Sequence, residues 1–198
     1  GGTVVVDAKK DINNIGAQIK GGNVFLTSKE GSINNITEVH TSGSDSDRKT
    51  SIGAVSGIVS DGALIMDAAK DINNVGAKLK AGETLALKAG NNINILSVQN
   101  AEASSKSIKN GRSSTSSVTN MGSVIEAGGN VIMDSGKDTT IKGSDVTAGS
   151  LMYVKTGGDF KLLADQDTTE TKTSTSRSGF GVGGGMWGTE TVKTTDFK

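Results

Sequence analysis

Two stretches of this chain, sixty positions apart, have almost the same sequence. "DAKKDINNIGAQIKGG" runs from Asp7 to Gly22, and "DAAKDINNVGAKLKAG" runs from Asp67 to Gly82. A near-copy of this length indicates either a duplicated enzyme site or a structural unit that stacks on copies of itself. The weaker repeats around these two stretches distinguish the alternatives.

A shorter repeat of about 20 residues lies beneath the long one. Ile12 is followed by Ile33, and Ile72 by Ile93, 21 positions on in each case. A glycine-rich joint separates the units, as in "IKGGNV", "LKAGETL" and "IEAGGNV". This period is too short for repeats of paired helices, and it favours a parallel β-helix with one coil in each repeat.

Apolar and polar residues alternate within each unit, which is the periodicity of a β-strand. We therefore predict an all-β fold, a parallel β-helix of about seven coils of ~20 residues that stack at the strand spacing of ~4.8 Å. The strand before each turn gives the expected equivalences: Val4 and Val6 with Val24 and Leu26, Leu64 and Met66 with Leu85 and Leu87, Val131 and Met133 with Leu151 and Tyr153.

Stacked coils should bring like residues into columns. Apolar columns fill the narrow interior of a β-helix, and asparagine amides can hydrogen-bond along a column. The expected structural columns are Ile12, Ile33, Ile72 and Ile93, continued by Thr139 and Phe160; a second interior stack of Ile15, Ile36, Val75 and Leu96; and a polar column of Asn13, Asn34, Asn73 and Asn94.

Three insertions interrupt the coils. The segments at about 40–57, 99–122 and 164–198 lose the repeat and are rich in Ser, Thr and charged residues. Residues 1–198 are thus interpreted as a single β-helix fragment of a longer protein, with extra-helical hairpins or loops. The third insertion holds Phe180, Met186 and Trp187 among glycines. These residues are either a partner-contacting tip, a flexible tip or aromatics folded onto the rod.

The sequence offers little for catalysis or cofactor binding. Its 21 basic and 21 acidic residues balance, which gives no electrostatic reason to expect a nucleic-acid partner. It has no cysteine, and His40 is the single histidine, without a partner at a recognised catalytic or zinc-binding spacing. Asp138 and Asp159 should stack near ~5 Å and form an acid pair or cation site, but turn capping explains the same residue types. We predict no catalytic residue, no cofactor and no metal.

The longest uninterrupted coil pair resembles a known family. "AGGNVIMDSGKDTTIKGSDVTAGSLMYVKTGGDFKLLAD", "LKAGETLALKAGNNINILS" and "ETKTSTSRSGFGVGGG" are similar to the haemagglutinin repeats of large bacterial exoproteins. The family includes filamentous haemagglutinin and the exoproteins of contact-dependent growth inhibition. The resemblance covers essentially the whole chain.

The resemblance implies a right-handed β-helix, secretion through a dedicated outer-membrane transporter of the two-partner route, and a location at the bacterial cell surface. It leaves open whether the parent is an adhesin or a toxin-delivery filament. A second hypothesis is a binding module, whose hairpins contact host glycans, receptors or the target-cell outer membrane. A third, disfavoured by the even spacing of the acidic residues, is a polysaccharide-degrading β-helix enzyme.

Overall fold

The structure is a computed structural model that describes residues 1–44, 47–177 and 186–197. Its regular secondary structure in these ranges consists of strands, and no helix occurs there. The chain divides into two compact units. The first, the solenoid unit, contains Gly1–Glu38, Ile52–Val98 and Met121–Asp165; the second, the hairpin unit, contains Val39–Ser51, Gln99–Asn120 and Gln166–Lys198.

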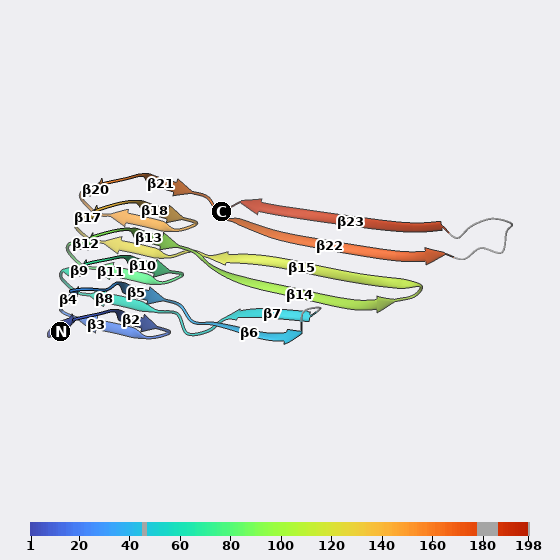
Figure 1. The fold of residues 1–198 in the computed structure, drawn as a ribbon, viewed down its shortest axis with the longest axis horizontal. Coiled ribbons are helices and arrows are strands. Elements are labelled where there is room, and N and C mark those ends of the chain that lie inside the picture. The colour runs from blue at the N-terminus through green and yellow to red at the C-terminus, as the bar shows by residue number, and fades with distance from the viewer. Residues whose placement is uncertain (45–46, 178–185, 198) are drawn as a thin grey trace. The chain divides into compact units, whose positions relative to one another are not determined.

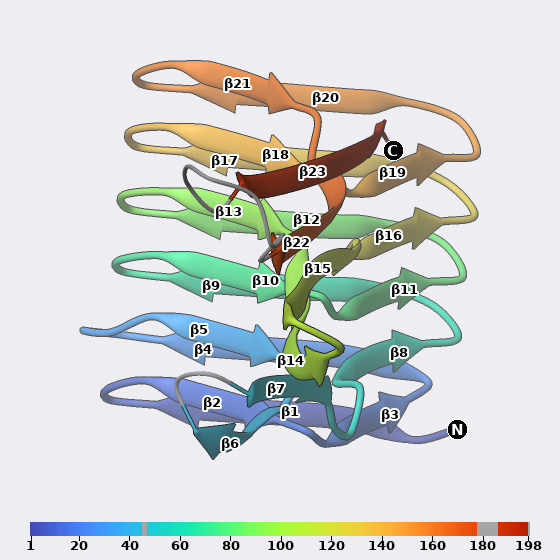
Figure 2. The same ribbon diagram turned by 90° about the vertical axis from the view of Figure 1, so that its right-hand side faces the viewer.

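The solenoid unit is built from three parallel sheets (Figures 1 and 2). Sheet A contains β1 (Thr3–Ala8), β4 (Asn23–Ser28), β9 (Leu64–Ala68), β12 (Leu85–Ala89), β17 (Val131–Ser135) and β20 (Met152–Thr156). Sheet B contains β2 (Ile12–Ile15), β5 (Ile33–Ile36), β10 (Ile72–Val75), β13 (Ile93–Leu96), β18 (Thr139–Lys142) and β21 (Phe160–Leu163). Sheet C contains β3 (Gln18–Gly21), β8 (Gly57–Ser60), β11 (Lys78–Ala81), β16 (Val124–Ala127) and β19 (Asp145–Ala148).

The chain passes through sheets A, B and C in turn and then starts the next layer, which is the winding of a parallel β-helix (Figure 2). The all-β, parallel-sheet prediction is thereby confirmed. Within sheet B, Ile12 pairs with Ile33, Ile33 with Ile72, and Ile72 with Ile93. Ile33, Ile72 and Ile93 are fully buried in the core between the sheets.

The expected second interior stack is wrong. Ile15 is 57% exposed, and its register partners Ile36, Val75 and Leu96 face outward beside it. Side chains of a strand alternate between its two faces, so a residue three positions after an inward isoleucine must point outward. The true second column of sheet B lies two positions after the first and consists of Asn14, Asn35, Asn74, Ile95 and Ile141.

The expected alignment of the last layer is also wrong, by one residue. Val131 pairs with Met152 and Met133 with Val154, so Tyr153 points outward. The neighbouring strand pair determines this register, because Ala127 pairs with Ala148, 21 positions on. Leu151 then falls at the turn position of Asn130, where its backbone N–H donates to the Asn130 Oδ1 at 3.2 Å.

Each layer without an insertion turns from sheet B to sheet C at a glycine with positive φ. These glycines are Gly16, Gly76 and Gly143, with φ of 59°, 55° and 52°. The following layer packs directly on them, because a Cβ at Gly76 would lie 2.2 Å from Cγ1 of Val98. The glycine is therefore needed both for the turn and for the close approach of the next layer.

We expect Gly76→Ala to lower the free energy of unfolding by at least about 2 kcal/mol, because it combines a left-handed backbone with a steric overlap. Urea denaturation of the purified chain measures the loss. Gly2→Ala is the matched control, because no atom lies within 4 Å of a Cβ there. Equal unfolding midpoints for the two variants would contradict the proposed role of the glycine.

Candidate binding surface on the hairpin sheet

Every second layer releases an insertion from the same corner of the solenoid. The chain leaves after β5, β13 and β21, and it returns to sheet C at β8 and β16. Buried Ser56 and Ser123 lie at the two return points. Ser56 Oγ donates to the Ile36 carbonyl at 2.7 Å, and Ser123 Oγ donates to the Leu96 carbonyl at 2.7 Å. Each hydroxyl thus connects the outgoing strand to the returning one.

The third exit is held by a buried carboxylate. Asp165 is 8% exposed, and its Oδ1 lies 3.2 Å from the Lys142 Nζ of the layer before it. Its Oδ2 accepts a hydrogen bond from the hydroxyl of Ser97. Because a buried carboxylate needs charged or polar partners, these contacts tie the end of the last layer to the two layers before it.

The insertions form strands of one antiparallel sheet, the hairpin sheet, in the order β23-β22-β15-β14-β7-β6 (Figure 1). The strands are β6 (Val39–Ser44), β7 (Asp47–Ile52), β14 (Val98–Ile108), β15 (Gly111–Met121), β22 (Gln166–Arg177) and β23 (Met186–Phe197). Neighbouring hairpins pair with each other along β15 and β22, from Gly111 with Thr175 to Val118 with Thr168. The insertions are therefore one continuous surface rather than three separate arms.

The surface of the hairpin sheet is dominated by hydroxyl side chains. Across β15 and β22, Ser113 faces Thr173, and Thr115 faces Thr171, with hydroxyl oxygens 3.4 Å apart in both pairs. Between β7 and β14, the Lys49 Nζ lies 2.6 Å from the Glu102 Oε1, and this hydrogen bond raises the pKa of Lys49. Such cross-strand pairs stabilise a two-sided polar sheet.

Two of the predicted contact residues, and the single histidine that the sequence analysis considered and set aside, lie on strands of this sheet. Met186 and Trp187 belong to β23, where their backbones pair with Arg177 and Ser176. Their side chains and the whole of Phe180 lie outside the described residues. His40 is exposed on β6.

Asp138 and Asp159 belong to a ladder along the turn that precedes sheet B. In each step, a side-chain oxygen accepts the backbone N–H of the corresponding residue one layer on, as from Asp159 to the Asp138 Oδ1 at 2.9 Å. The full ladder is Asp11, Ser32, Asp71, Asn92, Asp138 and Asp159. The residues cap the turn of the following layer rather than their own, which refines the turn-capping interpretation.

Lys161 neutralises the last two members of this ladder. Its Nζ lies 2.8 Å from the Asp138 Oδ2 and 3.3 Å from the Asp159 Oδ2. The hydrogen bond from Lys161, helped by the backbone N–H of Asp159, lowers the pKa of Asp138. Lys161 thus favours the ionised form of Asp138, which is unsuited to the role of a general acid.

We expect a carbon-13 NMR titration to place the pKa of Asp138 below its ordinary value, and Lys161→Met to move that pKa upward. Because the folded-state pKa is the lower one, the stabilising contribution of Asp138 is present above the unfolded-state pKa and is lost as the pH falls through the folded-state value. Lys155→Met is the control, since Lys155 pairs with Asp134 instead. An unchanged pKa in Lys161→Met would contradict the assignment.

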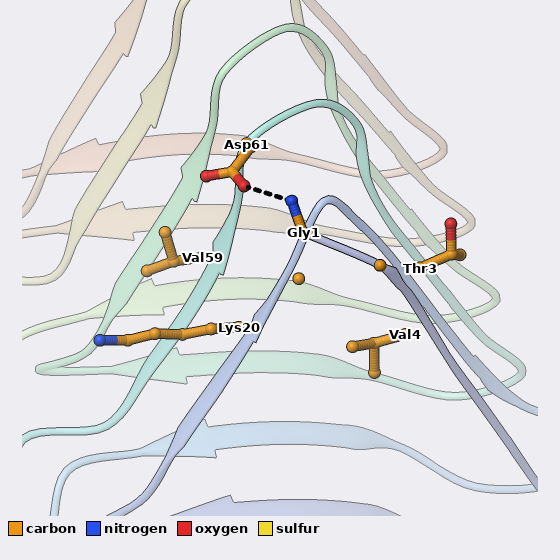
Figure 3. Close-up of a pocket in the computed structure, with 8 residues that line it drawn as sticks. Gly1, Thr3, Val4, Lys20, Val59 and Asp61 are labelled. Carbon is orange, nitrogen blue, oxygen red and sulfur yellow. Dashed lines mark hydrogen bonds and ion pairs between the residues drawn. The ribbon is translucent and has the colours of Figure 1, made fainter.

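A shallow pocket of about 500 Å³ is lined by residues of the first two layers of the solenoid (Figure 3). Its lining includes Val4, Lys20 and Val59, and the amino group of Gly1 lies 3.5 Å from the Asp61 Oδ2 at its rim.

The described residues contain no cluster of three or more His, Asp or Glu side chains suited to a metal ion. In the same part of the chain, no helix has the length and apolarity needed to cross a membrane.

Stacked layers of about 21 residues, polar ladders between the layers and a hairpin at every second layer define a structural repeat segment of the β-solenoid class. The chain belongs to the haemagglutinin repeat family: the family model described as "Hemagglutinin repeat" matches residues 38–112 and 105–195. The family resemblance noted in the sequence is confirmed.

Curated relatives carry the same segment within much longer proteins. The chain is 34% identical over 194 residues to the "tRNA nuclease CdiA" of Escherichia coli O6:K15:H31 (strain 536 / UPEC), with 90% of this chain and 6% of that protein covered. It is 28% identical over 175 residues to the "tRNA nuclease CdiA" of E. coli strain STEC_O31, which covers 85% of this chain and 5% of that protein. No solved structure matches the chain significantly.

A third relative, the "16S rRNA endonuclease CdiA" of Enterobacter cloacae, is 43% identical over 89 residues, 40% of this chain and 2% of that protein. The nuclease names belong to those whole proteins, whereas the matched part is their haemagglutinin repeat region, a structural segment. The homologues are secreted surface exoproteins, which confirms the secreted, cell-surface localisation expected for this chain.

Proposed function

We propose that this chain is a length of right-handed β-helical filament in a large secreted exoprotein that serves adhesion or toxin delivery to neighbouring cells. The continuous hydrogen-bonded stacking of sheets A, B and C supports a filament, because every layer offers its strands to the next. Right-handed winding is the general rule for parallel crossovers. The count of about seven coils and the single-fragment organisation, with insertions at about 40–57, 99–122 and 164–198, stay predictions.

An outer-membrane transporter of the two-partner route is the partner that this proposal requires. A solenoid folds as a sum of layer and interface energies, so it can form progressively as the chain emerges from the transporter. Nucleic acid has no role in the proposal.

The two-layer repeat permits a sharp test in the parent protein. Deletion of residues 64–130 removes two layers and their hairpin but joins Ala63 to Val131, which occupies the layer position of Leu64. We expect this variant to be displayed on the cell surface and to keep adhesion or toxin delivery. Deletion of residues 64–120 is the control, because it joins two sheet C strands in succession and breaks the stacking. If the in-register deletion abolished adhesion or toxin delivery, the segment would have a role beyond adding length to the filament, and the proposal would be wrong.

A binding module is the second candidate, in which the hairpins contact host glycans, receptors or the target-cell outer membrane. The half-buried hydroxyl pairs on the long strands β15 and β22 favour it. The predicted contact residues are Phe180, Met186 and Trp187. Removal of residues 178–188 should abolish cell binding while secretion continues, and unchanged binding would exclude this tip. A polysaccharide-degrading activity is not favoured, because Asp138 and Asp159 serve the turn ladder.

A further inference from the structure

The outer face of sheet A carries an unbroken column of apolar side chains, which we call the outer stripe. Each of the six strands contributes one residue, and the register places the six side by side. The outer stripe consists of Val5, Phe25, Ile65, Ala86, Ile132 and Tyr153. Because an outward apolar residue lies between two inward ones, every sheet A strand contains three apolar residues in succession, as in Val24-Phe25-Leu26. A strand with strictly alternating apolar and polar residues would not show this pattern.

This stripe is open to solvent. Val5 is 68% exposed, Ile65 40% and Tyr153 50%, while the other members are half-buried between their stacked neighbours. Outward positions on a solvated sheet are ordinarily polar. A contiguous apolar column rimmed by charge is the usual form of an interaction surface.

A second column beside the stripe, two residues further along each strand, carries the charges. Its members, in layer order, are Asp7, Thr27, Asp67, Lys88, Asp134 and Lys155. The signs therefore run negative, neutral, negative, positive, negative, positive. If two copies of this column face each other with opposite layer order, Asp7 of one copy lies opposite Lys155 of the other, and Asp67 lies opposite Lys88. Opposite charges are then brought together.

The geometry points to a second copy of this chain as the occupant of the outer stripe, with the two solenoids antiparallel and their A sheets face to face. A two-fold axis parallel to the strands keeps stripe on stripe and charge column on charge column, while it reverses the layer order. The first layer of one copy then meets the sixth of the other, and the third meets the fourth. Every charge in those layers gains a partner of opposite sign.

The other face-to-face arrangement has its axis parallel to the solenoid. It also joins the apolar stripes, but it places the charges opposite the uncharged column that begins with Thr3 and Asn23. Only the antiparallel arrangement places the charge columns of the two copies opposite each other with their signs complementary. Charge complementarity of this kind selects register and orientation more than it adds affinity.

The available area suits a weak but specific dimer. Six strands at ~4.8 Å by five residues at ~3.3 Å give a face of roughly 500 Å² in each copy, or roughly 1,000 Å² in a pair. Within one copy, Lys88 and Asp67 already pair at 3.3 Å, yet their side chains stay 68% and 46% exposed. These groups are consequently accessible to a facing copy.

Analytical ultracentrifugation of the 198-residue chain over a concentration series tests the association. We expect a monomer–dimer equilibrium, and we expect Ile65→Lys to weaken it at least about tenfold, because a lysine would face the apolar stripe of the other copy. Ile15→Lys is the matched control: Ile15 is 57% exposed on the outer face of sheet B, and its replacement should leave the dimer unchanged.

Complementary charge variants test the antiparallel order. The acidic variant Lys88→Glu/Lys155→Glu and the basic variant Asp7→Lys/Asp67→Lys/Asp134→Lys should each be monomeric alone and form a heterodimer when mixed. Circular dichroism verifies that both remain folded. A chain that is monomeric at every concentration, a dimer that survives Ile65→Lys, or variants that fail to combine on mixing would each overturn the inference.

Discussion

Replacement of Ile72 by aspartate is expected to unfold the middle of the solenoid. Ile72 is fully buried and pairs with Ile33 below and Ile93 above, so an aspartate there would place an unpaired carboxylate in the apolar column. The loss of isoleucine burial and the uncompensated charge together should cost at least about 4 kcal/mol. Urea denaturation followed by circular dichroism gives the change in the free energy of unfolding.

Ile15→Asp is the matched control, because it makes the same chemical change in the same sheet at a side chain that is 57% exposed. We expect it to change stability by less than about 1 kcal/mol. The comparison also tests the corrected side-chain orientation, since two interior stacks would have made the substitutions equally damaging. An Ile72→Asp chain with the wild-type midpoint would refute the stacked core.

The second large effect is expected at Asn35, the centre of a buried amide ladder. Its Oδ1 accepts from the Asn14 amide at 2.7 Å, and its own amide donates to the Asn74 Oδ1 at 2.7 Å. Asn35→Ala would leave both buried neighbours without these partners, and a buried unsatisfied polar group costs about 1–3 kcal/mol. We expect a loss of about 3 kcal/mol in the free energy of unfolding.

Asn34→Ala provides an unusually close control. Asn34 is the adjacent residue and makes the same two kinds of hydrogen bond, with Asn13 and Asn73 at 2.8 Å, but on the outer face where water can replace them. Its loss should cost at most about 1 kcal/mol. Equal costs for the two alanine variants would show that burial does not decide the role of the amides.

The same column suggests a complementary variant. Ile95 and Ile141 fill the Asn35 position in later layers and are almost fully buried. The column therefore accommodates both an amide ladder and stacked isoleucines. Simultaneous replacement of Asn14, Asn35 and Asn74 by isoleucine should consequently cost less than Asn35→Ala alone.

Much of the solenoid could be predicted from the 21-residue period. A period sets register directly: if Ile12 and Ile33 occupy the same place in successive repeats, stacking must pair them, and the structure does pair them. The alternation within Val24-Phe25-Leu26 likewise indicates a strand. Composition and the scattered acids argued against catalysis, and the residues of the repeat carried the family resemblance.

Two errors have one physical cause. The interior assignment of Ile15 and the matching of Met133 with Tyr153 both came from the spacing of apolar residues, whereas a side chain's face follows from strand parity and from the register of the neighbouring strands. Parity also turns Asn35 inward and Asn34 outward, although the two residues are chemically identical. No property of a single residue distinguishes them.

The repeat period alone was sufficient for the class of fold and for the pairing of Ile12 with Ile33, because these depend on order along the chain. Packing decided the rest. The pairing of β15 with β22, the outward stripe of sheet A and the amide ladder join residues from different layers, where distance in space replaces distance in sequence. Such contacts depend on the parity and the pairing of every strand, and both are set only in three dimensions.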